Sequence, residues 1–294
     1  MRAGETGAKN DPPRSLLLAT CLLNPVLQRA NRFLLPCAGL AAPLVLPTAW
    51  THSAAAGCGV LGACAMAHGA LAYATLRPNN ALFGPVATRF EPTGDEVWLT
   101  IDDGPDPHDT PRLLDLLDAQ PGGGARATFF LRGDRARAHP ALVGEIVRRG
   151  HGVGNHTLNH PQATFWCAGP RRLAREIGGC SDVLRALTGW EPRLFRAPVG
   201  HVNPFVHRAA ARRGLRLVGW SARGFDGVDR HAADPAGVVA RISEGLRPGA
   251  IILLHEGRRG RDGGAVNVRA TELLLATLAE RRWQGVVPDV AELR

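Results

Sequence analysis

Two adjacent carboxylates, Asp102 and Asp103, are the best-placed side chains for chemistry in this chain. They follow the apolar, β-rich run 97–101 and precede a turn formed by Gly104 and Pro105. Adjacent side chains that leave a strand point in different directions, so one carboxylate can bind a metal ion while its neighbour moves a proton. An ordinary acidic turn has the same composition, because Asp, Gly and Pro are common in loops between strands and helices. Partners elsewhere in the chain must therefore decide between the two interpretations.

The first candidate partners are two histidines, His156 and His160, four residues apart. A single helical turn would place both imidazoles on one face. Two neutral imidazoles and one carboxylate form a common three-ligand set for catalytic zinc, which leaves one position open for water. A solvated pair on a helix has the same spacing, but this pair follows a short strand-like run, as the aspartates do. Since barrel strands bring their carboxyl ends to one site, the shared placement predicts a metal centre.

Further predicted strands also end in polar or titratable residues. Arg196 follows one of them, where it can pair with Asp102 and hold that carboxylate ionised. The fully apolar run 251–254 ends in His255. A lone histidine after such a run usually has a structural role. In this chain, however, five predicted strands end in polar or titratable residues, and this shared feature indicates an active site. The remaining segment, 219–226, supplies Trp220, Arg223 and Asp226.

The elements that must position these residues alternate regularly from about residue 95 onward. We predict strands near 96–102, 126–131, 151–155, 193–197, 215–220, 250–255 and 285–288. The helices predicted between them span 111–119, 140–149, 170–187, 205–213, 235–246 and 267–282. Such alternation predicts an α/β fold with a mostly parallel sheet, and closure into a barrel is the economical way to bury it.

Composition limits the classes of partner. The chain has 294 residues, 45% of them apolar, which is enough for one barrel-sized domain and an appendage. Its net charge of +9 comes almost wholly from scattered arginines, because Lys9 is the only lysine. No basic stripe is interleaved with aromatic residues, so we expect no nucleic-acid partner. The six cysteines contain no Cys-x-x-Cys pair and predict neither a disulfide framework nor a zinc ribbon.

The N-terminal part of the chain differs from the rest. Residues 1–32 form a polar, then basic segment that we expect to be disordered, and 33–76 is hydrophobic. Two uncharged runs in the hydrophobic region are each long enough to span a bilayer and are separated by 51–53. We expect two transmembrane helices in a hairpin, and membrane lipid as a partner. A linker, 77–94, and a catalytic domain, 95–294, would follow.

Arginines flank the predicted hairpin on both sides, which would place both of its ends in the cytoplasm. A single span would instead place the rest of the chain outside. A cleaved signal peptide and a buried helical pair are further alternatives. The prediction is thus a protein associated with an inner membrane of the bacterial type, with the side of the catalytic domain left open.

At this point the motifs can be compared with a known family. The stretch 100–105 (TIDDGP), the pair His156 and His160, the pattern Arg196-x-Pro198-x-Gly200 and the run 253–255 (LLH) occur in the order and approximate spacing of the polysaccharide deacetylase family. This family is also called carbohydrate esterase family 4. The resemblance covers roughly residues 95–290. It implies a distorted, incomplete (β/α) barrel of seven strands, which agrees with the seven strands predicted above.

The resemblance also implies how the residues divide the chemistry. Asp103, His156 and His160 would hold a divalent metal, most often zinc. Asp102 would be the general base that takes a proton from the metal-bound water, and Arg196 would orient and charge-stabilise Asp102. A metal lowers the pKa of water and polarises an amide carbonyl, which is the chemistry that the residues suggest by themselves.

The resemblance places a general acid and a substrate pocket on the other side of the site. His255 would protonate the departing amine, because an amine anion is a poor leaving group, and Asp226 would tune His255. Leu253 would help to line the acetyl pocket. The other residues that we expect to bind substrate are Pro198, Val199, Trp220 and Arg223.

Two positions depart from the family pattern. Val199 stands where the family usually has an aromatic residue; a backbone N–H donated from this position to the oxyanion would survive the change. In the fourth motif, usually Asp-x-x-Asp-Trp, the chain has Arg223, Asp226 and Gly227. The missing tryptophan affects the wall of the acetyl pocket. The added cation suggests a preference for an anionic or lipid-phosphate-linked sugar.

The sequence therefore predicts a metal-dependent hydrolase that removes an N-acetyl or other N-acyl group from an amino sugar of a glycan. One alternative in the same class is a deacetylase or deformylase of a lipid-linked sugar at the membrane. Another is a carbohydrate-binding homologue that has lost catalysis. The latter would lack a metal ligand, the base or the acid, and none is missing from this sequence.

Overall fold

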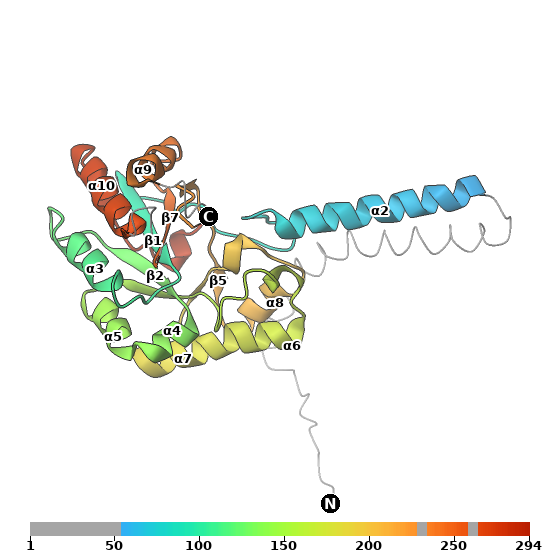
Figure 1. Ribbon diagram of the computed structural model, residues 1–294, viewed down its shortest axis with the longest axis horizontal. Helices are drawn as coiled ribbons and strands as arrows, with labels where there is room; N and C mark the ends of the chain where they lie inside the picture. Colours follow the sequence, from blue (N-terminus) through green and yellow to red (C-terminus); the bar gives the residue numbers. More distant parts are fainter. Residues whose placement is uncertain (1–53, 228–233, 258–263) are drawn as a thin grey trace, which may run out of the picture. The chain divides into compact units, whose positions relative to one another are not determined.

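The computed structural model describes residues 54–227, 234–257 and 264–294 (Figure 1). Its centre is a curled parallel sheet with the strand order β5-β4-β3-β2-β1-β7-β6, and β8 also pairs with β1. This open path of seven strands confirms the predicted incomplete barrel. The strands are β1 (Glu96–Asp102), β2 (Ala127–Leu131), β3 (Gly152–Asn155), β4 (Leu194–Phe195), β5 (Arg216–Leu217), β6 (Ala222–Arg223), β7 (Ile251–His255) and β8 (Gln284–Gly285).

Helices follow the strands much as the sequence predicts. The α-helices that follow β1 are α3 (Thr110–Asp118), α4 (Gly133–Ala138), α5 (Pro140–Arg148), α6 (Pro170–Leu173), α7 (Gly179–Thr188), α8 (Val206–Ala211), α9 (Pro235–Glu244) and α10 (Val266–Glu280). A π-helical turn, η2 (Ala174–Gly178), joins α6 to α7, and short 3₁₀ turns are η1 (Phe165–Cys167), η3 (Pro198–Gly200) and η4 (Val290–Glu292). Two elements were not predicted, α4 and β6. They are too short to show an apolar period, since β6 has two residues and α4 has six.

The alternation of β1 explains how the fold delivers carboxylates to the interior of the barrel. Val97, Leu99 and Ile101 point outward into the core between sheet and helices, whereas Trp98 packs inside the barrel. Successive strand residues face opposite sides, so Asp102 must lie on the same side as Trp98. The same rule applies to β7, where Leu253 belongs to the inner cluster. Its neighbour two residues on, His255, therefore also faces inward.

The open side of the sheet is bridged by a segment that precedes β1. Ala87 pairs with Val218 beside β5, and Arg89 pairs with Ala250 at the start of β7. Ala87 and Phe90 are buried in the inner cluster. Part of the stretch predicted as a linker is therefore packed against the sheet.

The helix α2 (Ala54–Leu76) covers the second of the two uncharged runs. Within the part of the chain that the structure describes, Cys58–Leu76 is the one helix long and apolar enough to cross a membrane, with a mean hydropathy of 1.4. Length and composition alone are weak evidence for a membrane span. The first run, 33–50, lies outside the described residues, so the predicted hairpin stays a prediction.

Candidate active site

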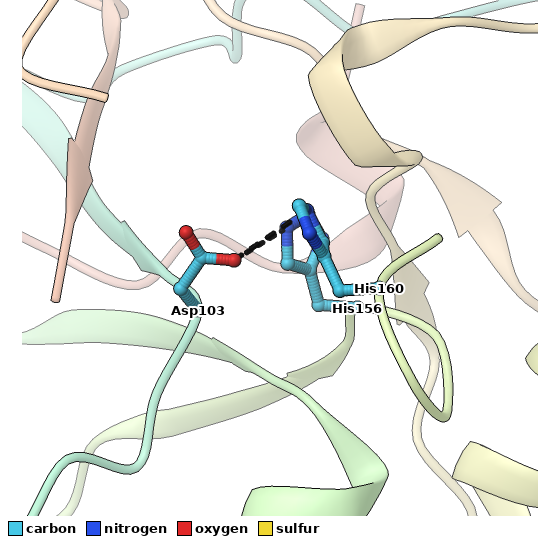
Figure 2. A group of neighbouring side chains, drawn as sticks. All are labelled: Asp103, His156 and His160. Atoms are coloured by element: carbon cyan, nitrogen blue, oxygen red, sulfur yellow. Dashed lines mark ion pairs between the residues drawn. The ribbon is translucent and has the colours of Figure 1, made fainter. Parts of the chain in front are cut away.

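Three side chains of types that can bind a metal ion converge at the carboxyl ends of β1 and β3. Asp103 directly follows β1, and His156 directly follows β3. The Asp103 Oδ1 atom lies 3.7 Å from His156 Nε2 and 3.4 Å from His160 Nε2 (Figure 2). One ligand atom from each of the three residues lies within 4.8 Å of the others. The predicted set of two imidazoles and one carboxylate is thus assembled in space.

The helical turn expected for the two histidines is wrong. Residues 156–160 form a loop in which Thr157 and His160 have left-handed φ angles of 67° and 50°. The rings of His156 and His160 nevertheless lie 4.7 Å apart, centroid to centroid. The loop is held by the β3 residue Asn155, whose Oδ1 accepts the Thr157 backbone N–H at 2.9 Å. Tertiary packing, rather than helical periodicity, therefore brings the two imidazoles together.

Hydrogen bonding and burial prepare both imidazoles to act as neutral ligands. The Nδ1 atom of His156 lies 2.9 Å from the carbonyl oxygen of Arg196. If Nδ1 carries the proton and donates it there, the Nε2 lone pair remains free to face the metal position. Burial, together with the nearby His156, lowers the pKa of His160 to about 3 despite the attraction of Asp103. A divalent cation that accepts nitrogen and oxygen ligands fits this donor set.

The second carboxylate, Asp102, is held by a buried arginine. The Arg196 Nη1 atom donates to Asp102 Oδ1 at 2.8 Å and to Thr100 Oγ1 at 2.7 Å. Its other nitrogens donate to the carbonyl oxygens of Val218 and Gly219. Because Arg196 is completely buried, its guanidinium can contact no water and must be satisfied by these groups. The predicted pair of Asp102 and Arg196 is thus present inside the barrel.

His255 and Asp226 form a second pair across the pocket. Asp226 Oδ1 lies 3.1 Å from His255 Nδ1, and Asp226 Oδ2 accepts the His255 backbone N–H at 2.8 Å. Burial opposes the charged form of His255, but the attraction of Asp226, with that of Asp102 and Asp103, outweighs it and raises the pKa of His255. The pair therefore favours an imidazolium that can deliver a proton.

A glycine makes room for the His255 ring. A Cβ added to Gly227 would lie only 2.6–2.8 Å from three ring atoms of His255. The family places a tryptophan here according to the motif, and this chain cannot hold one without moving the ring. The His255 ring therefore occupies space that a tryptophan at position 227 would need.

One pocket collects most of the predicted site residues. Its wall includes Asp102, Asp103, His156, His160, Val199, Trp220, Arg223, Asp226, Leu253 and His255. Two predicted residues do not line it, because Arg196 is buried behind Asp102 and Pro198 is buried in the turn η3. The sequence missed Phe225, which is 42% exposed at the same pocket. Its position beside Asp226 in the fourth motif was the available signal.

A second residue that sequence reasoning missed is Glu256, directly after His255. Its Oε2 atom accepts from the Thr110 hydroxyl and from the Asp106 backbone N–H. A Cβ on Gly104 would lie 2.6 Å from Glu256 Oε1, so the loop after Asp103 rests on this carboxyl group. Burial, with a smaller contribution from Asp106 and Asp109, raises the pKa of Glu256 to about 8. Glu256 therefore supports the loop that follows Asp103, and its burial favours the protonated form.

Comparisons with known proteins agree with this geometry. Residues 90–218 match the family model described as polysaccharide deacetylase, a match that ends before Asp226 and His255. The chain is 36% identical over 209 residues to a peptidoglycan-N-acetylglucosamine deacetylase of Bacillus cereus, covering 66% of this chain and 90% of that protein. The chain belongs to the polysaccharide deacetylase family. Members of this family are hydrolases of carbon–nitrogen bonds other than peptide bonds, which confirms the predicted enzyme class.

Two further relatives of this polysaccharide deacetylase support the same assignment. A chitooligosaccharide deacetylase of Bradyrhizobium sp. is 37% identical over 166 residues, covering 55% of this chain and 70% of that protein. The structure of a family 4 carbohydrate esterase from Streptomyces lividans in complex with acetate superposes with a TM-score of 0.58 and 30% identity, covering 68% of this chain and 96% of that one. The match to a solved structure confirms the predicted fold.

Proposed function

We propose that this polysaccharide deacetylase removes the N-acetyl group from an amino sugar of a glycan, with water as the nucleophile. One observation carries the proposal. The buried carboxyl group of Asp102, the group Asp103, His156 and His160, and His255 with its raised pKa line one pocket. The relatives of this chain are named as deacetylases of peptidoglycan N-acetylglucosamine and of chitooligosaccharides.

We propose that Asp103, His156 and His160 hold a divalent metal ion, with zinc as the first candidate. The support is the donor set itself, because two imidazoles and one carboxylate face one another and burial lowers the pKa of His160. When bound, the ion would acidify water and polarise the amide carbonyl. The protein supplies the remaining steps through the residues around it.

The proton leaves water through Asp102. Its Oδ2 atom lies 3.7 Å from His156 Nε2, so this oxygen faces the ligand cluster while Oδ1 is engaged by Arg196. Because Arg196 is rigidly held, Asp102 keeps one oxygen directed at the nucleophile's position. We propose that Asp102 is the general base and that Arg196 positions it.

The departing nitrogen must receive a proton, so the reaction also requires a general acid. His255 lies across the pocket with its Nδ1 held by Asp226, which leaves Nε2 to donate to the amine as the carbon–nitrogen bond breaks. Water adds to the carbonyl carbon, the acetyl group leaves as acetate, and the sugar keeps a free amine. We propose His255 as the general acid and Asp226 as its orienting partner.

The acetyl group needs an apolar pocket and a donor for its oxygen. Leu253 and Trp220 are buried apolar residues of the pocket wall and would contact the methyl group. We propose that the backbone N–H of Val199 donates to the developing oxyanion, since Val199 belongs to the turn η3 on the same wall. Pro198 would fix that turn rather than contact the substrate.

We also propose that residues 95–294 form the catalytic domain and that the apolar helix α2 associates with membrane lipid. The support for the lipid contact is the length and mean hydropathy of Cys58–Leu76. Recovery of the full chain in the membrane fraction, and release of a chain lacking 33–76 into the soluble fraction, would test it. A full chain that stays soluble would contradict it.

The function is tested with N-acetylglucosamine oligomers, by measuring released acetate. Full metal removal should abolish the activity, and added Zn²⁺ should restore it. Asp102→Asn should lower kcat by about 100-fold or more with an unchanged melting temperature. Asp95→Asn is the matched control, because Asp95 is exposed and distant from the site. Activity that survives complete metal removal, or an Asp102→Asn variant that keeps most of its rate, would overturn the mechanism.

A further inference from the structure

Arg223 occupies an unusual place in the pocket wall. It ends the two-residue strand β6, whose register places it beside Leu253 of β7. Its guanidinium carbon lies 4.1 Å from the centroid of the Phe225 ring and 5.8 Å from that of Trp220. The side chain is half-buried and lines the pocket together with these two rings. The aromatic rings therefore fix an arginine next to the proposed acetyl pocket.

The acids around this arginine are already engaged. Asp102 binds Arg196, and Asp226 binds His255, so neither is available to Arg223. Within the described ranges Arg223 forms no ion pair, and burial lowers its pKa. A partly desolvated cation without an anion is unfavourable in a folded protein. Such a cation is a favourable binding partner for an anion brought by the substrate.

The guanidinium carbon lies over the faces of both rings and the side chain lines the pocket, so we expect its N–H groups to be open to a ligand. An arginine that stacks on aromatic rings uses the faces of its plane, so the N–H groups at its edge remain free to donate. These groups match the two oxygens of a carboxylate or a phosphate in a bidentate arrangement. Arg223 thus has the geometry of an anion receptor within the substrate pocket.

Phe225 adds a second feature of a built site. Its φ angle is 60°, a left-handed conformation that is unfavourable for an aromatic residue, and its ring is 42% exposed. Strain of this kind persists where the surrounding structure imposes it, and it is common at binding sites. The ring both supports Arg223 and offers an apolar surface to a sugar.

We propose that Arg223, supported by Phe225, binds an anionic group on the sugar that flanks the N-acetylated residue and so selects acidic glycans. The inference rests on the proposed deacetylase function and names its substrate class. The anion would be a carboxylate or a phosphate, since both present two oxygens to the guanidinium edge.

The test compares three substrates of equal length: neutral N-acetylglucosamine oligomers, their C6-carboxylated form and their C6-phosphorylated form. The wild-type protein should have a higher kcat/KM for at least one acidic form, and the two acidic substrates identify which anion is preferred.

Arg223→Gln should lower the ratio of acidic to neutral kcat/KM about tenfold or more, since charge-assisted hydrogen bonds contribute that much. Arg223→Lys, which keeps the charge but loses the planar edge, should lower the ratio less. Phe225→Leu should lower it in the same direction.

The matched control is Arg171→Gln, which removes the same charge from an exposed residue outside the pocket and should leave the ratio unchanged. An unchanged ratio in Arg223→Gln, or a fall of equal size in Arg171→Gln, would overturn the inference. A wild-type protein that deacetylates neutral oligomers without preferring either acidic form would also overturn it. In these cases the proposed function stands, because deacetylation itself is observed. Absence of activity on all three substrates would count against the function instead.

Discussion

The interior and the rim of the pocket are built in opposite ways. In the interior, Asp102 and Arg196 are buried, and all three nitrogens of the guanidinium donate hydrogen bonds to protein atoms. On the rim, Val199 and Phe225 are 44% and 42% exposed and have left-handed φ angles of 59° and 60°. Hydrogen bonds fix the side chains of the interior in place, whereas the side chains of the rim are exposed and have strained backbones.

This difference separates chemistry from recognition. A base that must move a proton needs a fixed position, and rigid strands with satisfied partners provide it. Substrate selection can be placed on loops, where changes of side chain leave the scaffold intact. The departures from the family pattern, at Val199, Arg223 and Gly227, all lie around the rim and the fourth motif. The comparison predicts large effects for interior substitutions and smaller ones toward the rim.

The largest effect should come from Arg196→Met. The substitution leaves Asp102 buried without its counter-charge, which costs about 3–5 kcal/mol of stability when one partner of a buried pair is removed. The rate should also fall by about 100-fold or more, because the general base loses its orientation. Thermal unfolding and initial-rate measurements on acetylated oligomers check both.

The control for this variant is Arg213→Met, which removes an arginine from the exposed pair with Asp182. Surface pairs contribute about 1 kcal/mol or less, so this variant should stay close to wild type. Equal losses of stability in the two variants would contradict the special role of the buried pair.

Glu256→Gln tests the support beneath the metal loop through pH. Unfolding returns this carboxyl to an ordinary pKa near 4.5, whereas the folded pKa is about 8. Between these values the unfolded state releases a proton that the folded state retains, so stability falls as pH rises, by at most about 1.4 kcal/mol per pH unit. The variant, which cannot ionise, should lose this part of the pH dependence.

Chemical denaturation of both proteins at pH 5, 6.5 and 8 measures the difference. The exposed Glu280→Gln is the control and should follow the wild-type pH dependence. A parallel decline of wild type and Glu256→Gln across this range would show that Glu256 is ionised in the folded protein.

Gly227→Ala probes the boundary between interior and rim. The added Cβ would meet the His255 ring at 2.6–2.8 Å and displace it from its place beside Asp226. We expect kcat to fall about tenfold, which corresponds to a barrier higher by about 1.4 kcal/mol. The control Gly94→Ala adds a Cβ with nothing within 4 Å and should be neutral. Wild-type kinetics in Gly227→Ala would mean that the histidine ring can shift without consequence.

The smallest effect is expected for Val199→Gly on the rim. A β-branched residue at φ 59° is strained by about 1–3 kcal/mol, and glycine removes that strain. The greater freedom of glycine in the unfolded chain offsets about 0.4–1 kcal/mol, so a slight stabilisation remains. Activity should change little, because the proposed role of Val199 uses its backbone N–H. Thermal unfolding checks this, with Val287→Gly, a valine outside the left-handed region, as a control that should be destabilised.

Sequence reasoning worked where a local pattern carries the information. The apolar runs of β1 and β7 predicted both strands, and parallel strands bring their ends to one edge. Asp103, His156 and His160 could therefore be assigned to one centre. The helical turn predicted for the histidines failed, because the loop depends on Asn155, which accepts the Thr157 backbone N–H. The Asn155 side chain is itself held by Ile177 and Ser181, which are distant in sequence. Glu256 was missed because its contacts with Asp106 and Thr110 come from a segment distant in sequence.

The sequence by itself determined the parallel fold, the residue types of the centre and their membership in the polysaccharide deacetylase family. These features follow from hydrophobic periodicity and from motifs whose residues lie close together along the chain. Only the tertiary structure decided that Arg196 is wholly buried against Asp102 and that Gly227 makes room for His255. It also decided that Arg223 lies over two aromatic rings and forms no ion pair with the described residues. Such properties depend on packing between strands that meet only when the sheet curls, so no local pattern can encode them.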